Sequence, residues 1–311
     1  MLSRRNIRIK VMQVLYSMSR DPDLSKKEAL RQYRESINRS FELYLFNLWQ
    51  LVRAAAYAKE DAEKKTSKHL PTEADKRFTA KLWENGSVQS LMRHNQFRGL
   101  VSSLQLDSKL DQDITRKLYA EFSTHPEYLE YLDEQEDSEE KDNQVLLNLY
   151  KTCMNSELFL DLMEDHFPAW IDDRSLLIGS MKKTIKALPA TDDFLDEYKP
   201  TEETFKEFGE VLLDQVISKD EELLGWIEPT LKNWDAERVA VVDMILLKMA
   251  LCELTGFPTI PTKVTLNEFV EISKLYSTDK SKDFINGILD RLLKKLHKEG
   301  KINKEGRGLI E

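Results

Sequence analysis

Apolar residues recur at helical spacing along nearly the whole chain, and no segment shows the alternation of a half-buried β-strand. Ten glycines and nine prolines among 311 residues leave few positions for tight turns. The periodicity predicts a first helix from Arg4 to about Met18, with Ser3 as its N-cap. A long helix is expected over residues 26–65, ended near Pro71. We therefore expect an all-α protein.

The middle of the chain is predicted to hold a further helical set. Its members are expected at about 75–94, 96–105, 110–122, 143–165 and 170–188. The segment 189–200 begins and ends with proline and is the best candidate for a linker. Crisp helical patterns resume at Thr201 and again over about 220–232.

The last part of the chain contains three further helix signals. Asp235 is expected to cap a helix that is apolar nearly all round, which is typical of a central core helix. Thr265 and Glu268 have the spacing of a capping box. The final helix is expected to begin after Ser281 and to end near Lys298, with Gly300 at its C-terminal cap.

Charge and cysteine content limit the classes of function. The net charge of -9 argues against a general polyanion binder, but residues 1–20 hold five basic residues and no acid. This asymmetry is compatible with a local nucleic-acid footprint on an acidic body. Cys153 and Cys252 form no CxxC pair, so neither a disulfide framework nor a zinc site is expected. No apolar run is long enough for a membrane span, and we expect a cytoplasmic protein.

Signatures of catalysis do not occur in the sequence. Nucleotide-binding glycine motifs, the HExxH zinc motif and the GxSxG nucleophile motif are all missing. The five histidines are scattered without ligand spacing, and carboxylate pairs on helical surfaces are uninformative. We expect no enzymatic activity, cofactor or metal.

The basic first helix is the strongest functional signal that the residues alone provide. Arg5 and Arg8 lie one helical turn apart, so both guanidinium groups could reach one phosphate track. Gln13 and Tyr16 offer an amide and an aromatic face, which single-stranded RNA recognition also uses. The alternative is a solubilising polar face on an amphipathic helix, and composition alone favours that alternative.

Gly287 lies inside the last predicted helix, where glycine costs about 1 kcal/mol relative to alanine. We expect this glycine to permit the close approach of another helix. Asn286 beside it could bond to the backbone of a nearby loop.

Four segments in order resemble the NusB family of transcription antitermination factors. They are the basic opening that ends in Gln13-Val14-Leu15-Tyr16, the segment from Arg238 to Leu254, the segment from Ile260 to Glu271, and Phe284-Ile285-Asn286-Gly287-Ile288-Leu289-Asp290. Each motif alone is weak, but four in the right order are specific. The resemblance covers residues 1–20 and about 201–297, roughly a third of the chain.

The resemblance implies an all-helical, NusB-like bundle without catalysis. It also implies binding of boxA-type RNA, helped by a small-subunit ribosomal protein called NusE, in ribosomal RNA transcription. By position, the RNA-facing residues would be Arg4, Arg5, Arg8, Gln13, Lys280 and Lys282. Tyr16 and Glu253 would lie near the protein partner. The loop from Asp279 to Asp283 departs from the compact family members in the placement of its basic residues.

We divide the chain into a first family helix (1–20), an additional helical region of unknown role (21–200), a NusB-like bundle (201–298) and a polar tail (299–311). Two other functions stay open. The chain could be a protein-interaction scaffold with the same fold, which the retained N-terminal arginines argue against. It could also be the RNA-binding appendage of an RNA methyltransferase, but such enzymes need an α/β domain that the sequence does not predict.

Overall fold

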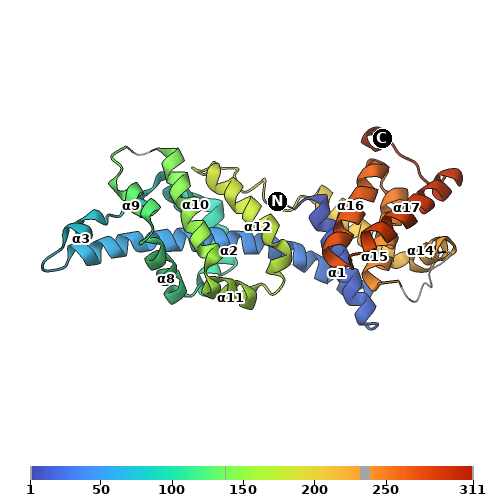
Figure 1. Cartoon of the computed structure of the whole chain (residues 1–311), viewed down its shortest axis with the longest axis horizontal. Coiled ribbons are helices and arrows are strands. Elements are labelled where there is room, and N and C mark those ends of the chain that lie inside the picture. The colour runs from blue at the N-terminus through green and yellow to red at the C-terminus, as the bar shows by residue number, and fades with distance from the viewer. Residues whose placement is uncertain (1, 137, 232–238, 310–311) are drawn as a thin grey trace. The chain divides into compact units, whose positions relative to one another are not determined.

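The computed structural model describes residues 2–136, 138–231 and 239–309. Within these ranges the chain is helical and contains no β-strand, as predicted (Figure 1). Two compact units are present. Unit 1 comprises residues 38–199, and unit 2 comprises residues 2–37 together with 200–311. The long helix α2 (Lys26–Thr66) contributes its first part to unit 2 and the remainder to unit 1. Among the described residues, no helix combines the length and apolarity needed to cross a membrane.

Unit 1 is built around residues 38–66 of α2. The residues of α2 from Leu43 to Val52 are all buried, so this helix is covered on every side rather than along one seam. Its shorter companions are α3 (Glu73–Arg77), α4 (Lys81–Glu84), α5 (Gly86–Arg93), α6 (Asn95–Ser103), α7 (Leu106–Lys109), α8 (Gln112–Phe122), α9 (Pro126–Asp133), α10 (Glu139–Asn155), α11 (Glu157–His166) and α12 (Trp170–Lys186).

Two helices predicted in unit 1 are interrupted in the structure. The helix expected over 75–94 is three short helices, and Asn85 caps the start of the third by accepting the N–H groups of Ser87 and Val88. The helix expected over 143–165 is interrupted at Ser156, which is extended between α10 and α11. Asparagine competes for backbone hydrogen bonds, and this property favours caps over helix interiors. The Ser156 side chain makes no capping hydrogen bond, so this explanation holds for Asn85 alone.

The predicted linker at 189–200 packs against unit 1. Leu195 and Tyr198 are buried, and the Tyr198 ring stacks on Tyr44 with centroids 4.7 Å apart. The proline-bounded segment therefore adds to a core instead of forming a solvated tether.

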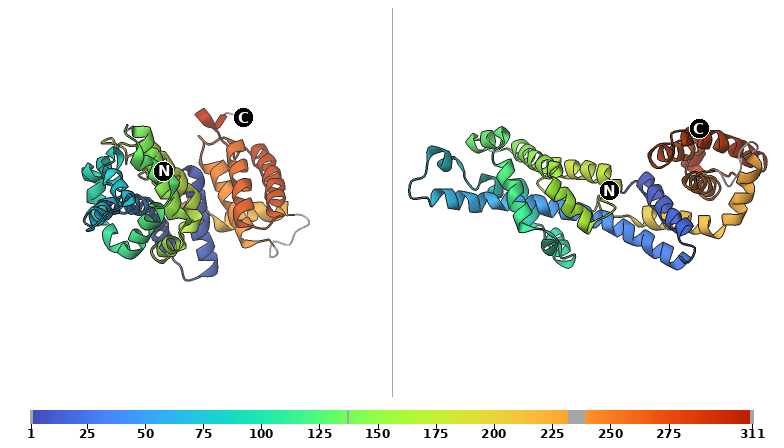
Figure 2. Two further views of the ribbon diagram at one scale, coloured as in Figure 1. Left: turned by 60° about the vertical axis from the view of Figure 1, so that its left-hand side comes forward. Right: turned by 60° about the horizontal axis from the view of Figure 1, so that its bottom comes forward.

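Unit 2 packs α15 (Val241–Gly256), α16 (Thr262–Tyr276) and α17 (Ser281–Lys298) side by side (Figure 2). The other helices of unit 2 pack around these three. They are α1 (Arg4–Arg20), the π-helix η1 (Glu203–Glu210), α13 (Val211–Ser218), α14 (Asp220–Ile227) and η2 (Glu228–Thr230). A short turn, η4 (Gly306–Leu309), ends the described chain. As expected, α15 is buried nearly all round and forms the centre of this core. Asp235 and Arg238 lie outside the described residues.

The helix caps of unit 2 are predicted well at its two ends. Ser3 and Asn6 form a reciprocal capping box at the start of α1. At the end of α17, Gly300 has φ +64, and the Lys301 N–H donates to the Leu296 carbonyl over 2.9 Å. The capping box predicted at Thr265 is wrong. α16 begins three residues earlier, at Thr262, and the buried Thr265 hydroxyl donates to Glu253 instead.

Candidate nucleic-acid interface

Arg8 lies at the centre of a buried ion pair. Its Nε and Nη2 donate to the Glu253 carboxylate over 2.7 and 2.6 Å, and the Thr265 hydroxyl donates to the same carboxylate over 2.7 Å. Arg8 is 2% exposed and Glu253 is 0% exposed. The rings of Phe208 and Phe269 lie 5.2 and 5.8 Å from the guanidinium carbon. These contacts satisfy a charge pair that would otherwise be costly to bury.

This burial corrects two of the expected site residues. Arg8 cannot present its guanidinium to a phosphate in this structure, because aromatic rings and Glu253 enclose it. Glu253 likewise offers no acceptor to a partner protein, because its carboxylate is fully buried. The two residues join α1 to α15 and have a structural role.

Arg5 does reach the surface, but it is also paired. Its Nε and Nη2 donate to Glu268 of α16 over 2.8 and 2.7 Å, and the arginine side chain remains 48% exposed. The Arg5 hydrogen bond lowers the pKa of Glu268 below its usual value, against the opposing effect of burial. A phosphate that binds Arg5 must therefore compete with a carboxylate that is already in place.

Arg4 is held more loosely at the start of α1. Its Nη2 lies 3.2 Å from Glu203 of η1, and both side chains are exposed. Its guanidinium carbon lies 5.7 Å from the centre of the Phe208 ring. An exposed pair of this kind is worth little in water, so Arg4 can exchange partners at small cost.

The remaining expected site residues lie at the surface of unit 2. Gln13 is half-buried and already interacts within the protein, whereas Tyr16 is 42% exposed. Lys280 and Lys282 are exposed at the start of α17. There Ser281 is buried and its hydroxyl donates to Asp243 of α15 over 2.7 Å. That bond fixes the turn that presents the two lysines.

The expectation for Gly287 is wrong. A Cβ atom at this position would meet nothing within 4 Å, so no neighbouring helix approaches it. Asn286 is exposed beside it. Close approach occurs at Gly209 in η1, where a Cβ atom would lie 1.8 Å from the Tyr33 hydroxyl oxygen and 2.6 Å from Ile7.

Glu203 and Glu268 are counter-ions of the arginines of α1, and the sequence did not predict either role. Arg4 and Glu203 are 199 residues apart, and Arg5 and Glu268 are 263 residues apart. No local pattern signals a pairing over such separations. These two ion pairs can be identified only from the three-dimensional structure.

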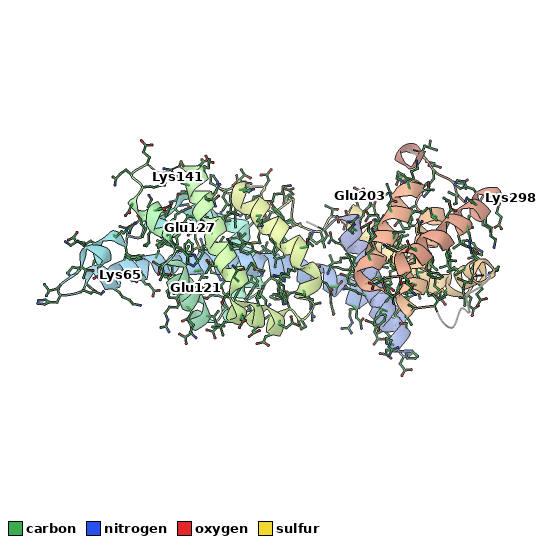
Figure 3. The ribbon with its side chains drawn as sticks, viewed as in Figure 1. Lys65, Glu121, Glu127, Lys141, Glu203 and Lys298 are labelled. Carbon is green, nitrogen blue, oxygen red and sulfur yellow. The ribbon has the colours of Figure 1, made fainter. Side chains whose placement is uncertain are left out.

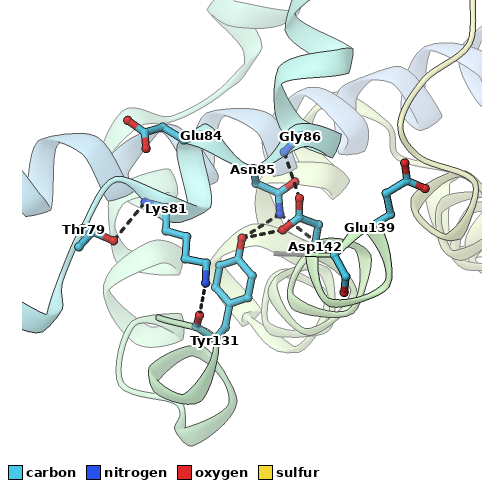
Figure 4. A pocket seen from close by; sticks show the side chains of 9 residues that line it. Thr79, Lys81, Glu84, Asn85, Gly86, Tyr131, Glu139 and Asp142 are labelled. Carbon is cyan, nitrogen blue, oxygen red and sulfur yellow. Dashed lines mark hydrogen bonds between the residues drawn. The ribbon is translucent and has the colours of Figure 1, made fainter. Parts of the chain in front are cut away.

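Unit 1 contains a polar pocket of about 400 Å³ lined by residues of α4, α5, α9 and α10 and of adjoining loops (Figure 4). Tyr131 donates to Asp142 over 2.9 Å, and the Gly86 N–H donates to the other oxygen of that carboxylate over 3.1 Å. Lys81 donates to the carbonyls of Tyr131 and Glu134. These groups bond to one another and so hold four helices together. Nowhere in the described ranges do three His, Cys, Asp or Glu side chains gather as metal ligands.

When the chain is compared with models of known protein families, residues 178–294 match the NusB family. This chain carries a NusB family domain. The matched residues include α13 to α16 and most of α17. They do not include α1, so the site residues of the first helix lie outside the match.

Three curated relatives, each named transcription antitermination protein NusB, are similar to about a third of this chain. The Salinibacter ruber protein is 43% identical over 105 residues, which are 34% of this chain and 66% of that protein. The Chloroherpeton thalassium protein is 37% identical over 106 residues, 34% of this chain and 50% of that protein. The Natranaerobius thermophilus protein is 40% identical over 90 residues, 28% of this chain and 65% of that protein. The chain thus matches between half and about two thirds of the length of these relatives. No solved structure matches it.

Proposed function

We propose that the chain acts in transcription antitermination by binding RNA through unit 2. The observation that carries the proposal is the NusB domain at residues 178–294, with relatives named for this activity at 37–43% identity. Exposed cations of unit 2 support it: Arg4 and Arg5 on α1, and Lys280 and Lys282 before and within α17. The proposed RNA is of the boxA type, in ribosomal RNA transcription, and no catalytic step is assigned.

We further propose that a small-subunit ribosomal protein, NusE, acts together with this chain on RNA. The charges of unit 2 motivate this partner. Arg4 and Arg5 are already neutralised by carboxylates, and Arg8 is buried. Few phosphate contacts then remain, and few contacts give weak, salt-sensitive binding. A basic partner beside α1 would extend the positive surface, and the half-exposed Tyr16 is suited to that junction.

The test is a titration of labelled boxA-type RNA against the full chain, with and without NusE, at several salt concentrations. We expect the chain alone to bind this RNA weakly and the mixture with NusE to bind it more tightly. Arg5→Ala should lower the affinity and flatten the salt dependence, because fewer counterions are released. Absence of RNA binding under both conditions would reject the proposal.

The same neutralised arginines favour one alternative, a protein-interaction scaffold of the same fold. On that alternative, NusE binds the chain but RNA affinity does not increase. The titration therefore separates the two functions.

A further inference from the structure

The end of α17 and the segment after it carry a dense positive charge. Residues 291–304 contain six Lys or Arg and one acid, in a chain of net charge -9. Exposed members include Arg291, Lys294, Lys298 and Lys301. The family match ends at residue 294, so most of this segment lies beyond it.

Several of these cations are not committed to carboxylates. Lys294 pairs with Asp290 and Lys301 with Glu299. Neither Lys295 nor Lys298 forms an ion pair among the residues that the structure describes, but Lys295 is half-buried. Lys301 and, to a lesser degree, Lys295 lower the pKa of the Glu299 carboxyl. Lys298 is exposed and extends from the end of its helix (Figure 3). Arg4 and Arg5 on α1, by contrast, each pair with a carboxylate. Lys298, which is exposed and forms no ion pair among the described residues, is therefore more available to a phosphate than the arginines of α1.

An aromatic ring lies among these charges. Trp226 of α14 is half-buried, and the Lys301 ammonium lies 4.5 Å from its ring centroid. Arg291 donates to the Thr230 carbonyl over 3.4 Å, and the Thr230 hydroxyl donates to the Trp226 carbonyl over 3.3 Å. These bonds hold η2 against α17.

Proteins that bind single-stranded nucleic acid combine cations, which contact the phosphates, with aromatic rings, on which the bases stack. We propose that Trp226, Arg291, Lys295, Lys298 and Lys301 form a second RNA-contacting surface, which binds single-stranded RNA outside the α1 site. This inference rests on the proposed function, and it deepens it by adding a site. A purely local role for the lysines is the competing explanation, because cations in the last turn also offset the helix dipole. That role affects stability but not RNA affinity.

The test compares two double variants of the full chain. Lys295→Gln with Lys298→Gln removes two proposed phosphate contacts, and Lys64→Gln with Lys151→Gln removes the same charge from exposed sites in unit 1. Binding of boxA-type RNA in the presence of NusE is measured against salt, and circular dichroism checks folding. The α17 variant should make the negative slope of log K against log salt shallower by about 1.4, at about 0.7 per phosphate for single strands. The control should leave the slope unchanged.

Trp226 provides an independent arm. Trp226→Phe keeps a ring and should bind RNA within about twofold of the unmodified chain, whereas Trp226→Leu should bind at least about fivefold more weakly. An unchanged slope in the folded α17 variant, while Arg5→Ala still weakens binding, overturns the second surface and leaves the proposed function standing. A full chain that binds no RNA with or without NusE overturns both.

Discussion

Arg5 and Arg8 lie one turn apart on α1 but have different environments. Arg8 is 2% exposed and enclosed with Glu253, whereas the Arg5 side chain is 48% exposed and pairs with Glu268 at the surface. A buried pair and a surface pair respond differently to mutation. Loss of one buried partner leaves an uncompensated charge, but loss of one exposed partner leaves a solvated side chain.

Glu253→Gln is therefore expected to destabilise the fold by about 3–5 kcal/mol, because it removes the closer of the two carboxylates that pair with the buried Arg8 and leaves only Glu268, 3.5 Å away. Arg34→Ala is the control, since it breaks an exposed pair with Glu210 and should cost at most about 1 kcal/mol. Urea unfolding measures both. Arg8→Met combined with Glu253→Leu should recover much of the loss. Equal effects of Glu253→Gln and Arg34→Ala would contradict the assigned burial.

Glu268→Gln is expected to strengthen RNA binding, because it releases Arg5 from its carboxylate. The salt slope should steepen by up to about 0.7 if the freed guanidinium gains one phosphate. Glu35→Gln is matched, since it removes the same charge and releases Arg31 on α2. Filter binding at several salt concentrations compares the two. A rise in affinity of the same size in both variants would show a general charge effect and not the release of Arg5.

The lowered pKa of Glu268 also predicts a pH dependence. Because the folded-state pKa lies below the ordinary 4.5, the pair contributes stability above that pH, and the contribution is lost as pH falls through the folded value. The difference in unfolding free energy between the unmodified chain and Glu268→Gln should thus be constant near neutral pH and shrink below about 4.5. A difference that grows on acidification would have the wrong sign.

At the scale of elements, most helices of unit 2 follow from local rules, and the exceptions depend on tertiary contacts. The Ser3 cap and the Gly300 terminus need only neighbouring residues, so the sequence predicts both. Thr265 has the spacing of a capping box, yet its hydroxyl bonds to Glu253 because α15 packs beside it. The buried Arg8 pairs with Glu253, which lies 245 positions away in the sequence, and helical periodicity cannot reveal a pairing of that kind.

Two glycines provide a matched test of helix packing. Gly209→Ala should destabilise by about 1–3 kcal/mol, because its Cβ would overlap Tyr33 and Ile7 against the π-helix η1. Gly287→Ala should stabilise by about 0.5–1 kcal/mol, because the new methyl group meets nothing within 4 Å and glycine is unfavourable inside a helix. Thermal unfolding distinguishes opposite signs. Destabilisation by both substitutions would imply an unrecognised contact at Gly287.

At the scale of the whole molecule, the NusB domain accounts for only part of the chain. The matched residues 178–294 fall largely in unit 2, while unit 1 has its own apolar core around α2. The division into residues 1–20, 21–200, 201–298 and 299–311 stays a prediction. Sequence periodicity indicates that the region 21–200 is helical, but it contains no motif that reveals what unit 1 binds.

We propose that unit 2 carries the RNA-binding surface. Ultraviolet cross-linking of boxA-type RNA to the full chain with NusE, followed by mass spectrometry of the peptides, tests it most directly. If unit 2 carries this surface, cross-linked peptides will come from residues 2–37 and 200–309, including those that contain Tyr16, Lys282 or Trp226. Cross-links confined to residues 38–199 would contradict it.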